Sequence, residues 1–308
     1  MGSGAGRWLL AGMTLAAAAV PNVMAVPARA SATPSARSQS WGAGRTAGAA
    51  EPAPGSISLY PLGDSLTFGA SGPYAVTPGG YRGTLAQDLG SLGINVTYTG
   101  TSTQNPPVAT DVSAYRHDGH PGFRIDQVAA DLDHGDPYSG DDGGDWLTGN
   151  SQHALERPQV IVLLIGTNDI LQSYDPGRSY PGGYNASEPG ERSQFVADMA
   201  NRLWSLLREL ARLDPGTRLV ICTIPPIGVT THDATGLAYD DSIRHRVMPE
   251  SRLFGLKSAL ADVESSFLAQ PSDQPDLIGP DGVHPTPVGY SRMAGVIASA
   301  VGAVLRNP

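Results

Sequence analysis

The sequence predicts an α/β fold, in which helices cover both faces of a parallel β-sheet. Short apolar runs alternate with longer amphipathic segments along residues 56–308, and this alternation of strand and helix is typical of a parallel sheet. The run "QVIVLLIG" at 159–166 is apolar throughout, as expected for a strand covered on both faces. The length of this region, about 250 residues, suits a single domain.

Four strands and one short final extended piece are expected along the chain. The strands lie at 56–62, 94–99, 159–165 and 218–223, and the extended piece precedes "PDGVHP" at 280–285. Cys222 is the only cysteine and falls in the fourth strand. With no second thiol it cannot form an internal disulfide, so we expect a buried packing residue.

Helices are expected between and after these strands, at 80–90, 124–132, 191–213, 248–269 and 288–305. The pattern is clearest at 191–213, where Phe195, Met199, Leu203 and Leu206 recur every three or four residues. Such spacing places the apolar side chains on one face of a helix.

The first 55 residues differ in composition from the rest. Residues 1–30 combine Arg7, an apolar alanine-rich run and the small residues Ala28 and Ala30, which predicts a cleaved signal peptide and a secreted protein. Pro21 breaks the apolar run, so it is too short for a spanning helix, and we expect no stable membrane association after cleavage. An uncleaved membrane anchor is the alternative. Residues 31–55 are rich in Ser, Ala, Gly and Pro, the composition of a disordered linker.

The net charge of −9 bears on possible partners. An acidic protein is unsuited to binding a phosphate backbone, so we expect no nucleic-acid partner. A neutral small molecule or polysaccharide suits the acidic surface better. We further expect a monomer.

Polar and small residues follow the candidate strands. In parallel sheets ligands bind beyond the carboxyl ends of the strands, so these positions are candidates for a site. They are Gly63-Asp64-Ser65 after the first strand, "HDGHPGFRID" at 117–126, Gly166-Thr167-Asn168-Asp169 after the third strand, and Asp281-Gly282-Val283-His284-Pro285 near the end.

Ser65 is the candidate nucleophile. A serine hydroxyl reacts only when a neighbouring base takes its proton. Of the seven histidines, only His284 stands in a tight Gly/Pro loop with an aspartate three residues earlier. That spacing lets the Asp281 carboxylate reach the imidazole and fix its tautomer.

A serine nucleophile also needs hydrogen-bond donors for the oxyanion that forms on the substrate. The candidates are the Ser65 N–H, the Gly122 N–H and the Asn168 side-chain amide, with Gly119 as an alternative to Gly122. Asp64 and Asp169 fit better as acceptors that brace the loops than as catalytic acids.

Two other patterns are absent. The motif G-x-S-x-G is incomplete, because Thr67 stands two residues after Ser65. The acidic residues at 131–145 do not match a calcium-binding loop, whose fifth and twelfth positions would be Gly135 and Asp142. We therefore predict neither a metal nor a cofactor.

Taken together, the blocks Gly63-Asp64-Ser65-Leu66, Gly122, Gly166-Thr167-Asn168-Asp169 and Asp281-x-x-His284 resemble the four blocks of SGNH (GDSL-type) hydrolases, in order and over the whole folded region. The resemblance implies a three-layer α/β/α sandwich with a flavodoxin-like sheet of strand order 2-1-3-4-5, and a catalytic domain at 56–308. It also implies Ser65 as nucleophile, His284 as base and Asp281 as the residue that orients it. Ser65, Gly122 and Asn168 would then be the oxyanion donors.

A narrower resemblance concerns the acetylxylan esterase branch, family three of the carbohydrate esterases. "YPLGDSLTFG", "GGYRGTLAQDL", "HDGHPGFRID" and "LLIGTND" are similar to it, although that branch usually has Glu where this chain has Asp118. The loops 135–150 and 171–190 are long and would reshape the pocket. Aromatic residues in or beside the loops would suit sugar rings or acyl chains: Tyr74, Tyr81, Trp146, Tyr174, Tyr180 and Tyr184.

These observations favour a secreted serine esterase that hydrolyses short-chain acyl esters, with O-acetyl groups on carbohydrates as the expected substrates. The same residues also fit an acyltransferase, in which a hydroxyl replaces water, and a general carboxylesterase or lipase. A carbohydrate-binding protein that has the fold without the activity is the alternative of another class. The sequence leaves the natural substrate and the acyl-chain length open.

Overall fold

The computed structural model describes residues 55–72, 75–107, 115–132, 157–173, 189–228, 230–269 and 276–306. The predicted signal peptide at 1–30 and the predicted linker, Gly55 excepted, lie outside these residues. The same holds for loop 135–150 and for 174–188 within the other long loop. The described residues all belong to one compact unit, 47–308.

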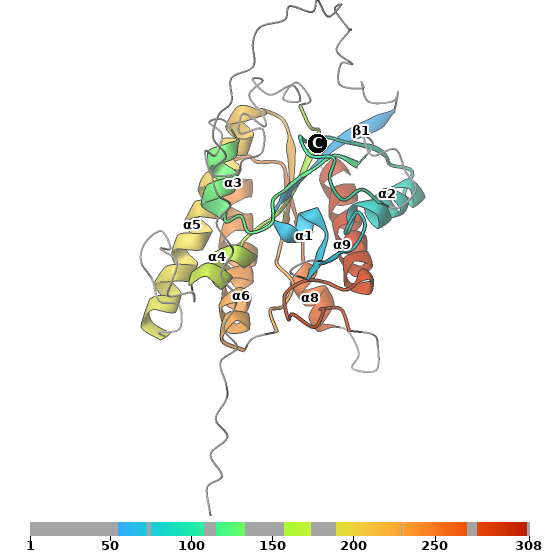
Figure 1. Ribbon diagram of the computed structural model, residues 1–308. Helices are drawn as coiled ribbons and strands as arrows, with labels where there is room; N and C mark the ends of the chain where they lie inside the picture. The colour runs from blue at the N-terminus through green and yellow to red at the C-terminus, as the bar shows by residue number, and fades with distance from the viewer. Residues whose placement is uncertain are drawn as a thin grey trace, which may run out of the picture. The chain divides into compact units, whose positions relative to one another are not determined.

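A parallel sheet forms the centre of this unit (Figure 1). Its main strands are β1 (Ser56–Gly63), β4 (Asn95–Tyr98), β6 (Val160–Leu164), β7 (Arg218–Cys222) and β8 (Ser258–Ala261). They are arranged as β4-β1-β6-β7-β8, and each neighbouring pair is parallel. In chain order this is 2-1-3-4-5, so the flavodoxin-like fold is confirmed.

Short strands extend the carboxyl edge of the sheet. β5 (Asp118–Gly119) pairs in parallel with the last two residues of β1. β2 (Ala70–Gly72) and β3 (Ala75–Val76) form a separate antiparallel pair. β5 thus extends the sheet at the carboxyl end of β1, and β2 contacts the short helix that follows β1.

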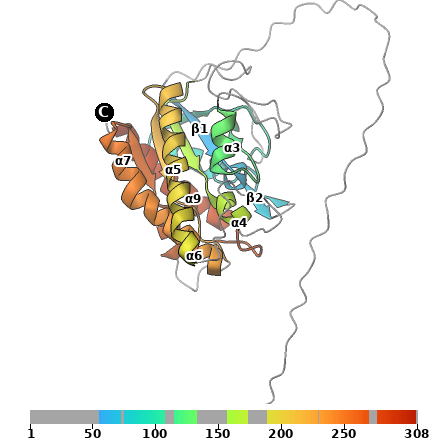
Figure 2. The same cartoon turned by 90° about the vertical axis from the view of Figure 1, so that its left-hand side faces the viewer.

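Helices cover the two faces of the sheet. α2 (Arg82–Ser91) and α9 (Pro287–Arg306) pack together on one side, where α9 also contacts β7 and β8. α3 (Ile125–Asp131), α5 (Pro189–Leu213) and α6 (Thr230–Ser242) pack on the other, which faces the viewer in Figure 2. The three layers are therefore α, β and α, as expected.

The sequence patterns explain the core. All five residues of β6 are buried, because helices cover both of its faces. On α5, Phe195, Met199 and Leu203 are buried at the predicted spacing. Cys222 is also buried, as predicted, at the end of β7.

The predicted helix at 248–269 is wrong. This stretch holds α7 (Met248–Leu253), the edge strand β8 and α8 (Val263–Leu268). α7 itself continues from α6 through a π-helical turn, Ile243–Val247. The short extended piece expected before "PDGVHP" is not a strand of the sheet, since Ile278 makes only an isolated bridge with Pro285. The fifth strand of the sheet is instead β8.

α9 is the one helix of the described residues that is long and apolar enough to cross a membrane by length and composition. More than half of its most apolar stretch is buried inside the protein. Its apolar face contacts β7, β8 and α2, so its composition is explained by its place in the core.

Candidate active site

Ser65 is the first residue of the short helix α1 (Ser65–Phe68), which begins where β1 ends. Asp64 caps this helix, and its carboxylate accepts a hydrogen bond from the Leu66 N–H at 2.9 Å. The strand and the cap therefore hold the Ser65 hydroxyl at the carboxyl edge of the sheet. Only 7% of Ser65 is exposed.

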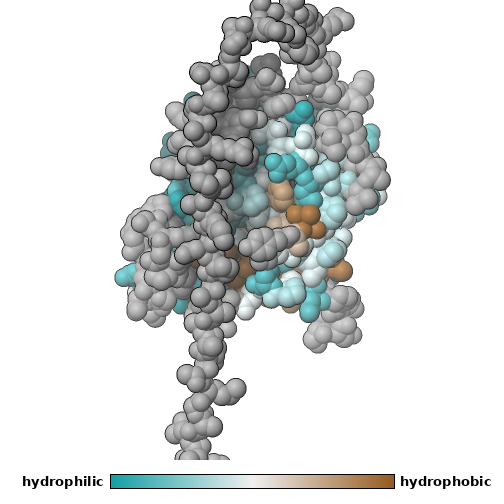
Figure 3. Space-filling model, in the orientation of Figure 1, coloured by the Kyte–Doolittle hydropathy of each residue, from teal (hydrophilic) through white to brown (hydrophobic). Residues whose placement is uncertain are grey.

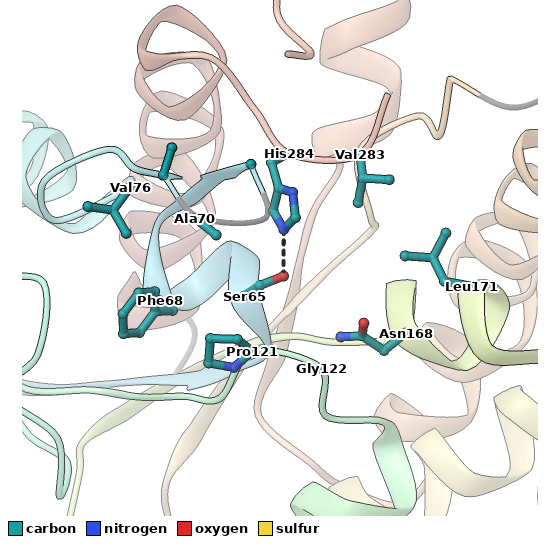
Figure 4. A pocket seen from close by; sticks show the side chains of 12 residues that line it. Ser65, Phe68, Ala70, Val76, Pro121, Gly122, Asn168, Leu171, Val283 and His284 are labelled. Carbon is teal, nitrogen blue, oxygen red and sulfur yellow. Dashed lines mark hydrogen bonds between the residues drawn. The ribbon is translucent and has the colours of Figure 1, made fainter. Parts of the chain in front are cut away.

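His284 supplies the neighbouring base. Its Nε2 atom lies 3.0 Å from the Ser65 Oγ, as the dashed line in Figure 4 shows. Its Nδ1 atom lies 2.6 Å from the Asp281 Oδ2. Donation from Nδ1–H to Asp281 leaves the lone pair of Nε2 free to accept the serine proton.

Asp281 also organises the loop that carries His284. Its Oδ1 atom accepts hydrogen bonds from the N–H groups of Val283 and His284, each at 3.0 Å. Burial raises the pKa of Asp281, but the hydrogen bonds from the His284 ring and from the two backbone groups outweigh it and lower the pKa below the ordinary value. The carboxylate is thus ionised and ready to stabilise an imidazolium.

The neighbouring loop after β7 supports this arrangement. The Gly228 N–H donates to the Gly282 carbonyl at 2.6 Å. Within the loop itself, the Gly279 N–H donates to the His284 carbonyl at 2.7 Å. The loop that carries the His284 imidazole is therefore held by one backbone bond to a neighbouring loop and one within itself.

Asn168 stands at the start of α4 (Thr167–Ser173), directly beyond β6. Its Nδ2 atom donates one proton to the Phe123 carbonyl at 3.0 Å, which orients the amide. Figure 4 shows its nitrogen on the side that faces Ser65. The second N–H of the amide is therefore placed to serve a substrate oxygen.

Gly122 follows Pro121 in a tight turn beside Ser65. Its φ of +88° and the hydrogen bond from the Phe123 N–H to the His120 carbonyl, 3.1 Å, match a type II turn, which needs glycine at this position. No described residue accepts a hydrogen bond from the Gly122 N–H. Figure 4 shows Pro121 and Gly122 on the opposite side of Ser65 from His284.

Gly119, the alternative to Gly122, does not fit as a donor. It is buried in β5, and its N–H already donates to the Nδ1 atom of His117 at 3.0 Å. A side chain there would collide with the backbone of α1, since a Cβ atom would lie 2.4 Å from the Phe68 nitrogen. Gly119 is needed because β5 and α1 approach each other closely at this position.

Asp64 and Asp169 lie beneath the site and accept hydrogen bonds from the backbone. The Asp169 Oδ2 atom accepts from the Ile125 N–H at 3.0 Å. Burial raises the pKa of Asp64 to about 7, although the Leu66 N–H opposes this, and the nearby Asp169 charge raises it further. Both carboxylates are fully buried and act as braces for the loops.

The histidines and aspartate of "HDGH" also form buried braces. The Asp118 carboxylate accepts hydrogen bonds from the Tyr60 hydroxyl at 2.7 Å and from the Thr101 N–H and hydroxyl. Burial and the Arg82 charge lower the pKa of His117 to about 3, so this ring stays neutral. Its Nε2–H donates to the Gln104 carbonyl at 2.9 Å.

A cavity of about 250 Å³ opens above Ser65. Beside Ser65, Gly122, Asn168 and His284, its lining is mainly apolar: Phe68, Ala70, Ala75, Val76, Pro121, Leu171 and Val283. Figure 3 shows apolar residues among hydrophilic ones on this face, near the position of α1 in Figure 1. The cavity suits an uncharged group.

The apolar lining has no motif of its own in the sequence. Three of its members lie close to motif residues, however. Phe68 follows Ser65 by one helical turn, Leu171 stands in the same relation to Asn168, and Val283 precedes His284. Their positions relative to the motif would have identified them.

Of the aromatic residues expected near the pocket, Tyr81 is the one that the structure describes, and that expectation is wrong. Its ring is buried, and its hydroxyl lies 3.3 Å from the Thr67 hydroxyl. The other five lie outside the described residues: Tyr74, Trp146, Tyr174, Tyr180 and Tyr184.

Within the part of the chain that the structure describes, no group of three or more His, Cys, Asp or Glu side chains is arranged to hold a metal ion. Residues 133–145 of the acidic stretch lie outside that part. The chemistry that can be described at Ser65 is that of a polarised hydroxyl, a base and hydrogen-bond donors. These are the groups that an acyl-transfer reaction requires.

Comparisons with known proteins agree with this chemistry. The model of the GDSL-like lipase/acylhydrolase family matches residues 62–292. The chain belongs to this family and is a carboxylic ester hydrolase. No curated protein matches the chain.

Several solved structures share the fold. A family 3 carbohydrate esterase from Clostridium thermocellum has a TM-score of 0.55 and 20% identity, over 82% of this chain and 98% of its own. A family 3 carbohydrate esterase from Talaromyces cellulolyticus has a TM-score of 0.56 and 18% identity, over 82% and 99%. The acetyl xylan esterase AlAXEase has a TM-score of 0.51 and 18% identity, over 80% and 100%. The structural neighbours thus include the branch that the sequence resembles.

Proposed function

We propose that the protein is a secreted serine esterase that removes short acyl groups, chiefly O-acetyl groups, from carbohydrates. The observation that carries the proposal is the chain of contacts from Ser65 through His284 to Asp281, at 3.0 and 2.6 Å. The predicted signal peptide at 1–30 supports secretion. The carbohydrate esterases among the structural neighbours support the substrate class.

The first half of the reaction acylates the enzyme. The Ser65 Oγ attacks the ester carbonyl carbon while the Nε2 atom of His284 takes the hydroxyl proton. The resulting oxyanion accepts hydrogen bonds from Ser65 N–H, Gly122 N–H and the Asn168 amide. The bond to the leaving oxygen then breaks, and His284 returns the proton to that oxygen, which releases the alcohol.

The second half restores the serine. Water replaces the alcohol, gives a proton to His284 and attacks the acyl carbon. The bond to Ser65 breaks, and the imidazolium returns the proton to the Oγ atom. Asp281 stabilises the imidazolium in both halves, because its carboxylate faces the Nδ1–H.

The test is Ser65→Ala, measured on p-nitrophenyl acetate and on acetylated xylan oligosaccharides. We expect turnover to fall by about 10,000-fold or more, because the nucleophile is removed. Ser91→Ala is the matched control, since this serine is exposed on α2. Circular dichroism checks that both variants fold. Wild-type rates in Ser65→Ala would refute the assignment of the nucleophile.

A general carboxylesterase is the second candidate, and the cavity is the observation that favours it. The cavity of about 250 Å³ is lined mainly by apolar side chains, which favour an acyl chain longer than acetyl. A series of p-nitrophenyl esters from acetyl to octanoyl, assayed beside acetylated xylan, chitin and pectin fragments, separates the two. A carbohydrate deacetylase loses kcat/KM steadily with chain length and releases acetate from a sugar polymer.

A further inference from the structure

Gly122 itself has little packing, although the rings of His120 and Phe123, at the two ends of its turn, stack with their centroids 4.9 Å apart. Gly122 is exposed, and a Cβ atom placed on it would meet nothing within 4 Å. The positive φ is accessible to glycine without cost, and so are many other conformations. A contact of the Gly122 backbone is therefore needed to fix its peptide groups if its N–H is to serve the reaction.

Gln172 makes a direct contact with the turn. Its Nε2 atom donates to the Gly122 carbonyl at 2.7 Å. Only 8% of Gln172 is exposed, so the donor side of the bond is shielded from competing water. Gln172 stands one helical turn after Asn168 on α4, and one rigid element therefore carries one oxyanion donor and the anchor of another.

Arg124 determines which way the Gln172 amide points. The Nη1 atom of Arg124 donates to the Gln172 Oε1 at 2.6 Å. Because the amide oxygen is engaged there, the NH₂ group must face Gly122.

Asp126 holds Arg124 in turn. The Arg124 Nε and Nη2 atoms donate to the two oxygens of Asp126, each at 2.9 Å. A bidentate pair of this kind fixes the plane of the guanidinium. The side chains of Asp126, Arg124 and Gln172 thus form one continuous relay that ends at the Gly122 carbonyl.

We propose that Gln172, oriented by Arg124 and Asp126, is a positioning residue that sets the distance between the two oxyanion donors Gly122 and Asn168. The inference rests on the proposed function, in which both donors bind the oxyanion. Gln172 touches neither the substrate nor Ser65 in this scheme. It acts through the turn, where a displacement of about 1 Å can cost about 100-fold in rate.

The first test compares Gln172→Leu with the matched control Gln194→Leu, which alters an exposed glutamine on α5. We expect Gln172→Leu to lower kcat by about 10- to 100-fold and to change KM less than about threefold, because the lost interaction matters in the transition state. The affinity for phenylboronic acid, which forms a tetrahedral adduct with the serine, should fall by the same factor as kcat. Gln194→Leu should keep the wild-type values.

The second test uses Gln172→Glu, which keeps the shape but replaces the donor by an acceptor. An ionised carboxylate keeps the bond to the Arg124 guanidinium, which favours the charged form, but it cannot donate to the Gly122 carbonyl and repels it. Gln172→Glu should therefore lower kcat at least as much as Gln172→Leu does, with the same fall in the affinity for phenylboronic acid. A residue that acts only by filling space would give a smaller loss in Gln172→Glu than in Gln172→Leu.

The inference is overturned if both Gln172 variants keep kcat within twofold of the wild type, or if kcat falls while the affinity for phenylboronic acid is unchanged. Should Gln172→Leu fail to fold, Gln172→Glu and Arg124→Lys provide the same measurements, because Arg124→Lys loses the bidentate pair but keeps the charge. Ser65→Ala separates the two proposals. If Ser65→Ala is inactive and the Gln172 variants are normal, only this inference fails; if Ser65→Ala is active, the proposed function fails.

Discussion

The Ser65 Oγ and the His284 Nε2 atoms lie 3.0 Å apart, although 219 residues separate them in the chain. The parallel sheet explains their meeting, because β1 delivers Ser65 to the carboxyl edge and the loop before α9 crosses the same edge. The tyrosine Tyr290 of α9 adds a contact at this edge, where its hydroxyl donates to the Ala70 carbonyl at 2.5 Å. The two groups are thus in contact before a substrate arrives.

Removing the charge that orients His284 should slow the reaction strongly. For Asp281→Asn we expect kcat to fall by about 10,000-fold, because an amide favours the wrong imidazole tautomer and cannot stabilise the imidazolium. The measurement is kcat on p-nitrophenyl acetate. Asp276→Asn makes the same chemical change at an exposed position nearby, and it should leave kcat within about twofold. Equal rates in both variants would argue against the role of Asp281.

Removing one oxyanion donor should affect the transition state more than substrate binding. For Asn168→Ala we expect kcat to fall by about 100- to 1,000-fold, or about 3–4 kcal/mol, with little change in KM. Steady-state kinetics on the same ester give both values. Asn95→Ala is the control, because Asn95 is exposed at the opposite edge of the sheet, where β4 begins. A variant with normal kcat would remove Asn168 from the oxyanion site.

The buried Asp64 predicts how stability depends on pH. Its pKa of about 7 shows that the folded protein holds this proton more tightly than the unfolded chain does. The stability that it contributes is therefore complete below the ordinary carboxyl pKa near 4 and is lost as the pH rises through about 7. This difference corresponds to about 4 kcal/mol at most.

The variant Asp64→Asn tests this dependence. The amide oxygen can still cap α1, but it does not titrate. We expect the variant to gain stability relative to the wild type between pH 5 and pH 8, measured by urea unfolding at each pH. Asp88→Asn, on α2, serves as the control. A constant difference between Asp64→Asn and the wild type at all pH values would contradict the assignment.

Arg82 should be important for stability. It is fully buried, and its guanidinium donates to the carbonyls of Tyr115, Phe68 and Asn105. Burial lowers its pKa to about 10, so it remains charged at neutral pH. For Arg82→Met we expect a loss of about 2–4 kcal/mol in the free energy of unfolding, because these carbonyls lose a buried donor.

Urea unfolding measures this loss, and Arg208→Met is its control, since Arg208 is exposed on α5. A loss below about 0.5 kcal/mol in Arg82→Met would show that the three carbonyls find other partners. The kcat of Arg82→Met is a second measurement. Ser65 begins α1 and Phe68 ends it, so the loss of a hydrogen bond at the Phe68 carbonyl should also lower kcat.

The sequence allowed most of the sheet to be predicted, because β6 and β7 are apolar runs, β1 and β4 alternate apolar and polar residues, and turn residues bound all four. The edge strand β8 was not predictable in this way. Its sequence "SALA", before Val263–Leu268, is rich in residues with high helix propensity. Its pairing with β7 decides its structure, and a tertiary contact of this kind leaves no local signal.

The same division applies to the site. Ser65, Asn168, Asp281 and His284 could be selected as candidates because their residue types and order match a known chemistry. Gln172 could not, because a glutamine inside a helix is ordinary. Its partner lies 50 residues away in the chain, and only the folded structure reveals the relay.

The separation of 219 residues between Ser65 and His284 also has a consequence for synthesis. A ribosome adds about 5–20 residues per second, so the imidazole emerges about 10–40 s after the hydroxyl. Throughout this interval the nascent polypeptide holds its serine without a proton acceptor. Translation that stops before Asp281 therefore yields a product that lacks the base, however much of the sheet it contains.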